Sequence, residues 1–299
     1  ALFAQRARLA LWEPLLDAIA EAATALMPAH IEQQSADALA TAMQHHRTQD
    51  IVVALVLYTW LLTAFQEDRQ KAAEIQNNLG AAYWTLASGD RQANLEKAIA
   101  CYQAALQVYT RDAFPVDWAT TQNNLGAAYW TLASTDGQDR QANLEKAIAC
   151  SQAALQVYTR TAFPADWART QFNLGRVYND LPDENRQANL EKAIACYSSA
   201  LQVYTHDDFP AVWAKTNDSL GNAYLSLPGE NRQENLQKAI DCYKAALEIY
   251  THQNFPIAWA RAHHRLGDAY RDLTDGDPQQ GNLKKAIAYY QAALQVYTR

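Results

Sequence analysis

Four cysteines at matching positions are the first candidates for chemistry in this 299-residue sequence. Cys101, Cys150, Cys196 and Cys242 each stand just before a tyrosine or a serine. No CxxC pair or Cys/His zinc spacing accompanies them. Equivalent positions in stacked helices lie about 8–10 Å apart, whereas a disulfide needs Cα atoms within about 7 Å. We interpret the four as reduced packing residues of a cytoplasmic protein and expect no metal or other cofactor.

Histidines and catalytic motifs give no indication of an active site. His45–His46 and His263–His264 are adjacent pairs, and adjacent residues of a helix point about 100° apart, so neither pair forms a ligand set by itself. The sequence contains no HExxH, GxSxG or P-loop motif. We predict that these residues form no enzyme, and that any Cys-His protease would lie outside them.

The cysteines belong to an internal repeat that organises most of the chain. The stretch 94–132 returns with small changes, and the copies begin at Asn94, Asn143, Asn189, Asn235 and Asn282. Successive copies start 46 to 49 residues apart. A repeat of this length indicates a stacked array that grows by adding units.

Each repeat is expected to contain two helices. The first begins at a Phe-Pro pair such as Phe114-Pro115, because proline is favoured in a first helical turn. A tryptophan follows each of these prolines by three residues, and we predict a core position for Trp118, Trp167, Trp213 and Trp259. The second helix is expected to begin at the repeated asparagine, since asparagine is a favoured N-cap.

A glycine recurs inside every first helix, at Gly80, Gly126, Gly175, Gly221 and Gly267. Glycine costs about 1 kcal/mol relative to alanine in a helix interior. Its return in every repeat predicts that the neighbouring helix approaches closely at this point. No second glycine completes a phosphate-binding loop.

The first 66 residues are not clear copies of the repeat. Helices are expected over 2–11, 14–27 and 31–46, and the run 51–65 is the most apolar in the chain. That run is shorter than the roughly 20 residues that span a bilayer, so we predict a buried helix and no membrane contact. Residues 31–65 can form a degenerate repeat that caps the array.

Composition and net charge limit the kinds of partner that the protein can bind. Hydrophobic residues make up 49% of the chain, which is enough for continuous burial, and the formal net charge is −7. A nucleic-acid binder normally carries a basic surface. We therefore expect no nucleic-acid partner.

The repeats resemble tetratricopeptide repeats, from about residue 68 to 299. Leu79-Gly80 with Tyr83 matches the pattern of that family's first helix, and Ala98, Tyr102 and Ala105 match its second. The unit here is longer than the usual 34 residues. The segment TQNNLGAAY looks most like kinesin-light-chain-type repeats and like bacterial arrays. Such bacterial arrays are often attached to CHAT-type peptidases or signalling ATPases.

The resemblance implies an all-α fold, an α-solenoid in which antiparallel helix pairs form a right-handed superhelix. It predicts an N-terminal helical cap over residues 1–66 and a repeat region over 67–299. The five expected repeats cover about 67–112, 113–161, 162–207, 208–253 and 254–299.

In that family the first helices line a concave groove that binds a peptide or a partner helix. Register from the Leu-Gly pair carries this role to positions of this sequence. The predicted groove residues are Asn77, Trp84, Asn123, Trp130, Arg169, Phe172, Arg176, Lys215, Asp218, Asn222, Arg261, His264 and Arg271.

These positions suggest how a ligand would be held. Asn77 and Asn123 can pair with the backbone of an extended peptide, and Trp84 and Trp130 can add apolar contact. The arginines and lysine towards the C-terminal end favour an acidic or carboxylate-bearing ligand. The alternative, that these are ordinary solvated helix faces with tryptophans packed between repeats, stays open.

Three functions remain in competition. The first is a non-catalytic scaffold that binds a peptide or partner protein in the groove. The second is a regulatory or sensor segment of a larger signalling protein, fused for example to a CHAT-type peptidase or an ATPase. The third is a self-associating array, that is, a homo-oligomer.

Overall fold

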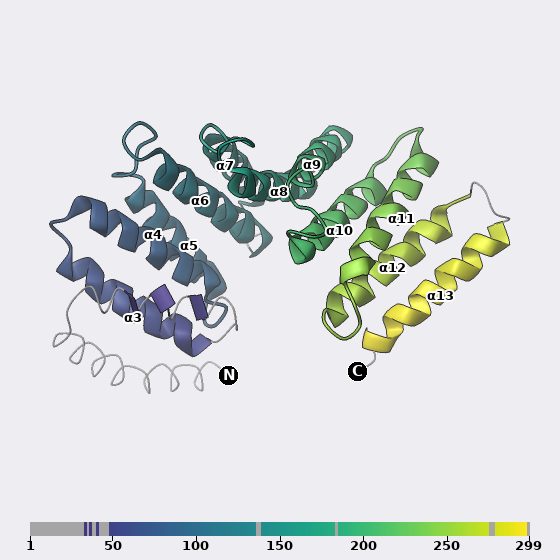
Figure 1. Cartoon of the computed structure of the whole chain (residues 1–299), viewed down its shortest axis with the longest axis horizontal. Coiled ribbons are helices and arrows are strands. Elements are labelled where there is room, and N and C mark those ends of the chain that lie inside the picture. The colour runs from purple at the N-terminus through teal and green to yellow at the C-terminus, as the bar shows by residue number, and fades with distance from the viewer. Residues whose placement is uncertain are drawn as a thin grey trace. The chain divides into compact units, whose positions relative to one another are not determined.

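The described part of the chain folds entirely into helices. A computed structural model describes residues 33–34, 36–37, 40–41, 48–135, 139–182, 185–274 and 279–297, and these contain eleven helices and no strand. The helices expected over 2–11 and 14–27, and most of the one over 31–46, lie outside the described residues. The helices (Figure 1) are α3 (Thr48–Ala64), α4 (Arg69–Thr85), α5 (Arg91–Ala105), α6 (Pro115–Thr135), α7 (Arg140–Ala154), α8 (Pro164–Asp180), α9 (Arg186–Ala200), α10 (Pro210–Ser226), α11 (Arg232–Ile249), α12 (Pro256–Asp272) and α13 (Gln279–Tyr297).

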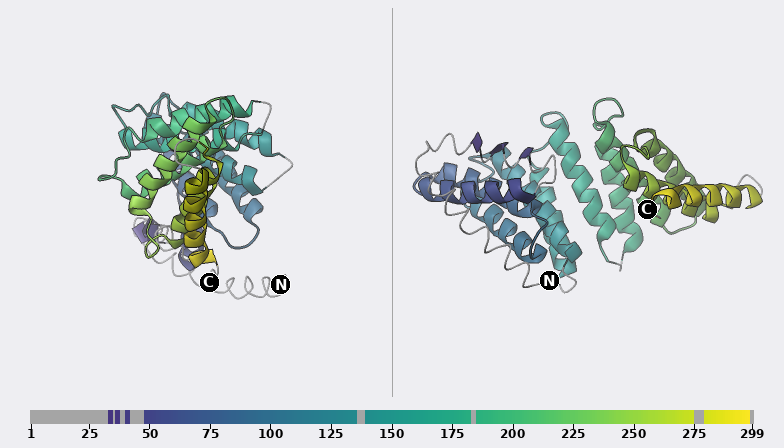
Figure 2. Two further views of the ribbon diagram at one scale, coloured as in Figure 1. Left: turned by 90° about the vertical axis from the view of Figure 1, so that its right-hand side faces the viewer. Right: turned by 90° about the horizontal axis from the view of Figure 1, so that it is seen from below.

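The helices form hairpins that stack within two compact units, Ala1–Val157 and Tyr158–Arg299. In the first unit α4 pairs with α5 and α6 with α7, and α5 packs against α6. In the second unit the hairpins are α8–α9, α10–α11 and α12–α13, joined by contacts of α9 with α10 and of α11 with α12. Figure 2 shows the same hairpins from two further directions. The predicted all-α array of helix pairs is confirmed, and the handedness of its superhelix stays a prediction.

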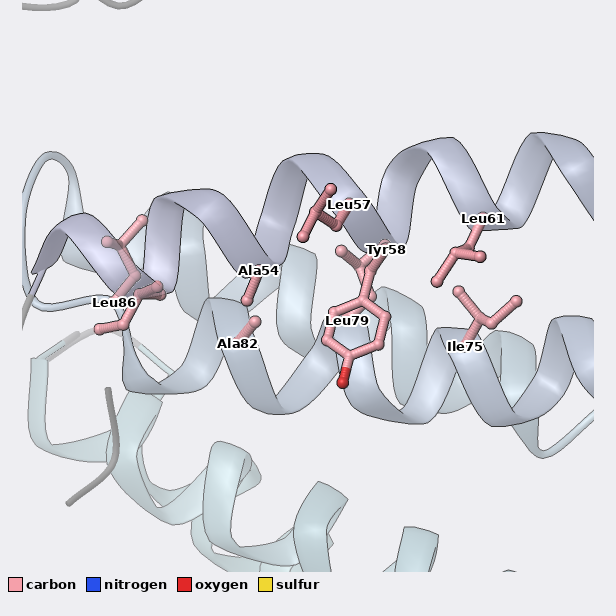
Figure 3. Close-up of a cluster of buried hydrophobic side chains, with 9 residues drawn as sticks. Ala54, Leu57, Tyr58, Leu61, Ile75, Leu79, Ala82 and Leu86 are labelled. Carbon is pink, nitrogen blue, oxygen red and sulfur yellow. The ribbon is translucent and has the colours of Figure 1, made fainter. Parts of the chain in front are cut away.

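Helix α3 is buried against α4, as its apolar sequence predicted. Ala54, Leu57 and Leu61 of α3 face Ile75 and Ala82 of α4 (Figure 3), within one core cluster. All five of these side chains are at most 6% exposed. In the described stretches of the chain, no helix combines the length and apolarity needed to cross a membrane.

The Phe-Pro pairs begin the first helices, as predicted. Helices α6, α8, α10 and α12 all start at the proline. The phenylalanine packs backwards onto a tyrosine that follows the preceding second helix. The ring centroids of Tyr109–Phe114, Tyr158–Phe163, Tyr204–Phe209 and Tyr250–Phe255 lie 5.4–5.6 Å apart. Each pair therefore joins one repeat to the next at the turn between them.

The repeated asparagine does not begin the second helix, and that prediction was wrong. Helix α5 starts at Arg91, three residues before Asn94, and its N-cap is Asp90, whose carboxylate accepts from the amide of Ala93 at 3.1 Å. The helix begins earlier because Arg91 and the two residues after it are good helix formers. Asn94 is buried in the first turn, and its side-chain amide donates to the Ser88 carbonyl of the loop at 2.9 Å.

Replacing Asp90 with alanine should lower the free energy of unfolding by about 1 kcal/mol, because the amide of Ala93 loses its acceptor. Asp139 occupies the equivalent position before α7 and makes no side-chain capping bond. Asp139→Ala is therefore the matched control and should change stability by only a few tenths of a kcal/mol. Urea unfolding of both variants measures the difference, and equal losses would contradict the assignment of Asp90 as the cap.

The glycines mark close helix approach, as predicted, and the neighbour is usually a tyrosine ring. A Cβ on Gly80, Gly175, Gly221 or Gly267 would lie 2.5–2.8 Å from a ring carbon of Tyr102, Tyr197, Tyr243 or Tyr290, respectively. The second repeat has Ser151 in the tyrosine position, and there Gly126 faces the Ala147 carbonyl and the Cys150 and Ser151 side chains. The glycine thus makes room for the largest side chain of the hairpin core.

Basic side chains tie the two helices of a hairpin together: an arginine in three of the hairpins and a lysine in all five. Arg91, Arg186 and Arg232 donate to carbonyls at the C-terminal end of the preceding helix, those of Trp84 and Leu86, of Asn179 and of Leu225, respectively. A lysine of the second helix lies 5.3–5.6 Å from the centroid of a tyrosine ring of the first, in the pairs Lys97–Tyr83, Lys146–Tyr129, Lys192–Tyr178, Lys238–Tyr224 and Lys285–Tyr270. Arginine at a helix C-terminus complements the helix dipole, and lysine over an aromatic ring adds a cation–π attraction.

The four tryptophans that we expected in the core are only partly buried. Trp118 packs beside Tyr109, and Trp259 beside Tyr250. They lie at the edge of the core because the small Ala119, Ala168, Ala214 and Ala260, one residue later, occupy its fully buried positions.

The cysteines are free thiols, one buried and three partly buried. Burial raises the pKa of Cys101, Cys150 and Cys196 to about 11 and that of Cys242 to about 12. A thiol with so high a pKa is protonated at neutral pH and is a poor nucleophile.

Candidate functional site

The first helices of successive repeats contact one another within each unit. Helix α4 contacts α6 in the first unit, and α10 contacts both α8 and α12 in the second. The predicted groove residues all belong to these helices. What the surface formed by the first helices can bind therefore depends on which of these side chains already make contacts between repeats.

In the first unit two of the four predicted groove side chains join α4 to α6. The side-chain carbonyl of Asn77 accepts from the Thr121 hydroxyl at 3.3 Å, and the indole N–H of Trp84 donates to the Thr131 hydroxyl at 3.1 Å. Asn123 is only 2% exposed. Trp130 is partly buried. This half of the predicted groove offers a ligand little free polar surface.

In the second unit two cations lie over one buried ring, and a third cation is near one of them. Phe172 of α8 is 5% exposed. Lys215 of α10 lies with its Nζ 5.3 Å from the ring centroid, and Arg176 of α8 lies with its Cζ 5.7 Å away. Arg261 of α12 is close enough to Lys215 to act on its charge. We call Arg176, Lys215 and Arg261 the basic cluster.

The charges of the basic cluster repel one another. Burial lowers the pKa of Lys215, and the like charges of Arg176 and Arg261 lower it further. Burial also lowers the pKa of Arg176. Each shift means that the protonated form is less favourable here than in water. An anion placed among the three would relieve this cost.

Nearby carboxylates partly balance the basic cluster: Asp180 favours the charged form of Arg176, and Asp218 pairs with Arg261. Asp218 of α10 is 3% exposed, and its Oδ2 accepts from Arg261 Nη2 at 3.0 Å. Its Oδ1 is buried without a hydrogen-bond partner. Burial raises the pKa of Asp218, and Arg261 opposes that rise. The sequence predicted groove positions for Asp218 and Arg261 but gave no indication that the two side chains pair between neighbouring repeats.

The other predicted residues of the second unit have their own partners. Arg169 pairs with Asp166 one turn earlier at 2.8 Å, and Asn222 accepts from the Tyr243 hydroxyl at 2.9 Å. Arg271 pairs with Asp272 at 2.8 Å. His264 is half exposed, with Nε2 3.7 Å from Asp268. The structure thus brings together Phe172 with the basic cluster and Asp218, and leaves these four outside that group.

The cluster has the chemistry of a binding surface. In the portion of the chain that the structure describes, no group of three His, Cys, Asp or Glu side chains could hold a metal ion. Lys215 and Arg261 stay accessible to solvent. They can donate to carboxylate or phosphate oxygens.

The fold defines the class of the protein as a tetratricopeptide-like array of helix hairpins. The model of the Sel1 repeat matches five segments of the sequence, which together cover more than half of it. The matched residues are 70–107, 119–156, 168–202, 219–248 and 260–295. The chain belongs to the Sel1 repeat family.

Solved structures with a similar arrangement are only distantly related in sequence. A crystal structure of MamA is 21% identical, and the match covers 69% of this chain and 91% of that one with a TM-score of 0.46. A crystal structure of BtubC (BKLC) from P. vanneervenii is 17% identical, and the match covers 91% and 89% with a TM-score of 0.46. No curated protein matches the sequence.

Proposed function

We propose that the chain is a non-catalytic scaffold that binds an acidic segment of a partner protein on the first-helix face of its second unit. Sel1 and tetratricopeptide-like repeats generally act as protein-interaction scaffolds. The observation that carries the acidic specificity is the basic cluster on a chain whose net charge is −7.

The local charge balance supports this choice of partner. Lys215 carries a pKa lowered by its cationic neighbours, and the buried Asp218 is engaged by Arg261. A carboxylate of the partner beside the exposed Lys215 would stabilise its charged form. The buried ring of Phe172 lies beneath Lys215 and Arg176 and helps to position both cations.

Lys215→Glu should weaken binding of an acidic probe by about tenfold or more, because it places a negative charge where the ligand's carboxylate would lie. The probe is a rhodamine-labelled extended peptide rich in Asp and Glu. Lysine-rich and Asn/Gln-rich peptides of equal length provide the comparison. Fluorescence anisotropy measures the three affinities at low and high salt, and added salt should weaken the acidic peptide most.

Two control variants separate the basic cluster from general charge. Lys284→Glu makes the same charge change on α13, at an exposed lysine away from the basic cluster, and should leave binding within about twofold of the native chain. Lys215→Arg should retain most of it. Equal binding of all three peptides, or equal effects of the two Lys→Glu changes, would overturn the proposal.

The finer resemblance to kinesin-light-chain-type and CHAT-associated arrays stays a hypothesis, as does the regulatory role that it suggested. Self-association through like repeats is a further hypothesis. Neither requires the basic cluster, so the peptide experiment also separates the scaffold proposal from both.

A further inference from the structure

The first helices of the second unit carry a row of cations at one register. Arg169 of α8, Lys215 of α10 and Arg261 of α12 each follow the proline of the Phe-Pro pair by five residues. Neighbouring helices pack about 8–10 Å apart, a distance that an extended peptide spans with about three residues. One acidic segment can therefore meet more than one of these cations.

The three cations of this row differ in whether the protein itself neutralises them. Arg169 pairs with Asp166 of the same helix at 2.8 Å. Arg261 pairs with Asp218 of the neighbouring helix at 3.0 Å. In the stretches that the structure describes, Lys215 has no carboxylate within ion-pair distance, and burial and like charges both lower its pKa. Lys215 is thus the cation of the row that most needs an anion from a ligand.

The residue three positions before the cation accounts for the difference between α8 and α10. This position holds Asp166 in α8 and Val212 in α10. Residues three apart lie on one face of a helix, so the aspartate reaches Arg169, whereas the valine offers Lys215 no charge. Val212 is 37% exposed, and α10 contacts both α8 and α12. Val212 and Lys215 thus stay exposed with a neighbouring first helix on either side.

We propose that this position determines which cations of the row bind the acidic ligand. An aspartate there, as in α8, neutralises the cation within the protein. An uncharged residue there, as in α10, leaves the cation to the ligand. The inference rests on the proposed function, since the ligand is the same acidic segment. It adds that Val212 makes Lys215 the main contact of that ligand and that Asp166 withholds Arg169 from it.

Val212→Asp should weaken binding of the acidic peptide by about five- to tenfold, although Lys215 itself is unchanged. The added carboxylate pairs with the lysine, as Asp166 pairs with Arg169, and repels the carboxylates of the peptide. An acidic residue is favourable in the first turn of a helix, so the variant should keep its fold, which circular dichroism checks. Fluorescence anisotropy with the three peptides described above measures the affinity.

Val212→Asn is the matched control, because its amide has nearly the shape of a carboxylate without the charge. It should keep binding of the acidic peptide within about twofold of the native chain. Asp166→Val is the reciprocal change. It should strengthen binding by about threefold or more, because Arg169 is released to the ligand.

The pKa of Lys215 gives a readout that a change in packing alone would not move in this direction. It should rise in Val212→Asp and not in Val212→Asn, since a carboxylate nearby favours the charged form of the lysine. An NMR titration of the lysine side chains in the free protein, with Lys215→Arg to assign the signal, measures it.

Two kinds of outcome separate this inference from the proposed function. A native chain that prefers the acidic peptide, together with unchanged binding by Val212→Asp or by Asp166→Val, would overturn the inference and leave the proposed function standing. So would equal losses from Val212→Asp and Val212→Asn, because the charge would then not matter. A native chain that binds all three peptides equally would overturn both.

Discussion

Tyr243→Ala is expected to lower the free energy of unfolding by about 3–5 kcal/mol, the range for removing a large buried aromatic ring. Tyr243 is fully buried and fills the space above Gly221, where an added Cβ would lie 2.8 Å from its ring. Neighbouring helices can close such a space only in part, so a cavity remains inside the hairpin of α10 and α11. Urea unfolding monitored by circular dichroism measures the loss.

Tyr243→Phe is the matched variant, since it keeps the ring and removes only the hydroxyl that donates to Asn222 at 2.9 Å. Its expected cost is about 1 kcal/mol, typical of one partly buried hydrogen bond. If the alanine and phenylalanine variants lost equal stability, the ring would contribute nothing and the packing account of the repeated glycine would be wrong.

Arg261→Ala is expected to lower the free energy of unfolding by about 2 kcal/mol at neutral pH. It leaves the carboxylate of Asp218 buried, with one oxygen already lacking a partner. Breaking a fully buried ion pair costs about 3–5 kcal/mol, and the smaller value applies here because the Arg261 side chain is 48% exposed. Denaturant unfolding of the two proteins at one ionic strength gives the comparison.

The pH dependence of this loss has a definite sign. Burial raises the pKa of Asp218 in the folded state, and removing Arg261 takes away the larger of the two arginine charges that oppose the rise, leaving that of Arg265. A raised carboxyl pKa destabilises the fold at pH values above it, and the penalty is relieved as the pH falls through it. The difference in the free energy of unfolding between the native chain and Arg261→Ala should therefore become smaller as the pH is lowered from about 7 to about 4.5, towards the ordinary carboxyl pKa of about 3.9.

The double variant Arg261→Ala/Asp218→Asn tests the same point without acid. An uncharged amide in place of the carboxylate should recover at least half of the lost stability, because the buried charge is gone. A pH-independent loss that the second substitution does not reduce would show that Arg261 acts through packing alone.

Most of the fold could be predicted because the signals that specify it recur in every copy. Phe-Pro marks where four of the first helices begin, and the repeated glycine marks where a ring packs. The repeated asparagine gave a wrong helix start because its side-chain amide donates a hydrogen bond to a loop carbonyl outside the helix. No helix-capping rule describes this contact. The arginine three residues before the asparagine, as in Arg91, recurs in four of the five copies, and this spacing was the signal that could have identified its role.

The candidate site could be predicted only as a set of positions on one face. Register placed Lys215, Asp218 and Arg261 there, but register cannot say that a carboxylate of α10 meets a guanidinium of α12. Nor could it separate Asn77, whose side chain is used between repeats, from Lys215, which stays accessible. Both distinctions depend on distances between helices that are 40 or more residues apart in the sequence.

The five lysine–tyrosine contacts described above lie inside single hairpins, and so do the glycine–tyrosine contacts. Lys146 meets Tyr129 within one hairpin, just as Lys238 meets Tyr224 within another. The gene can therefore gain or lose the segment for a whole hairpin without separating any of these paired residues. Unequal recombination between near-identical copies would lengthen or shorten the protein while each surviving hairpin kept its own internal contacts.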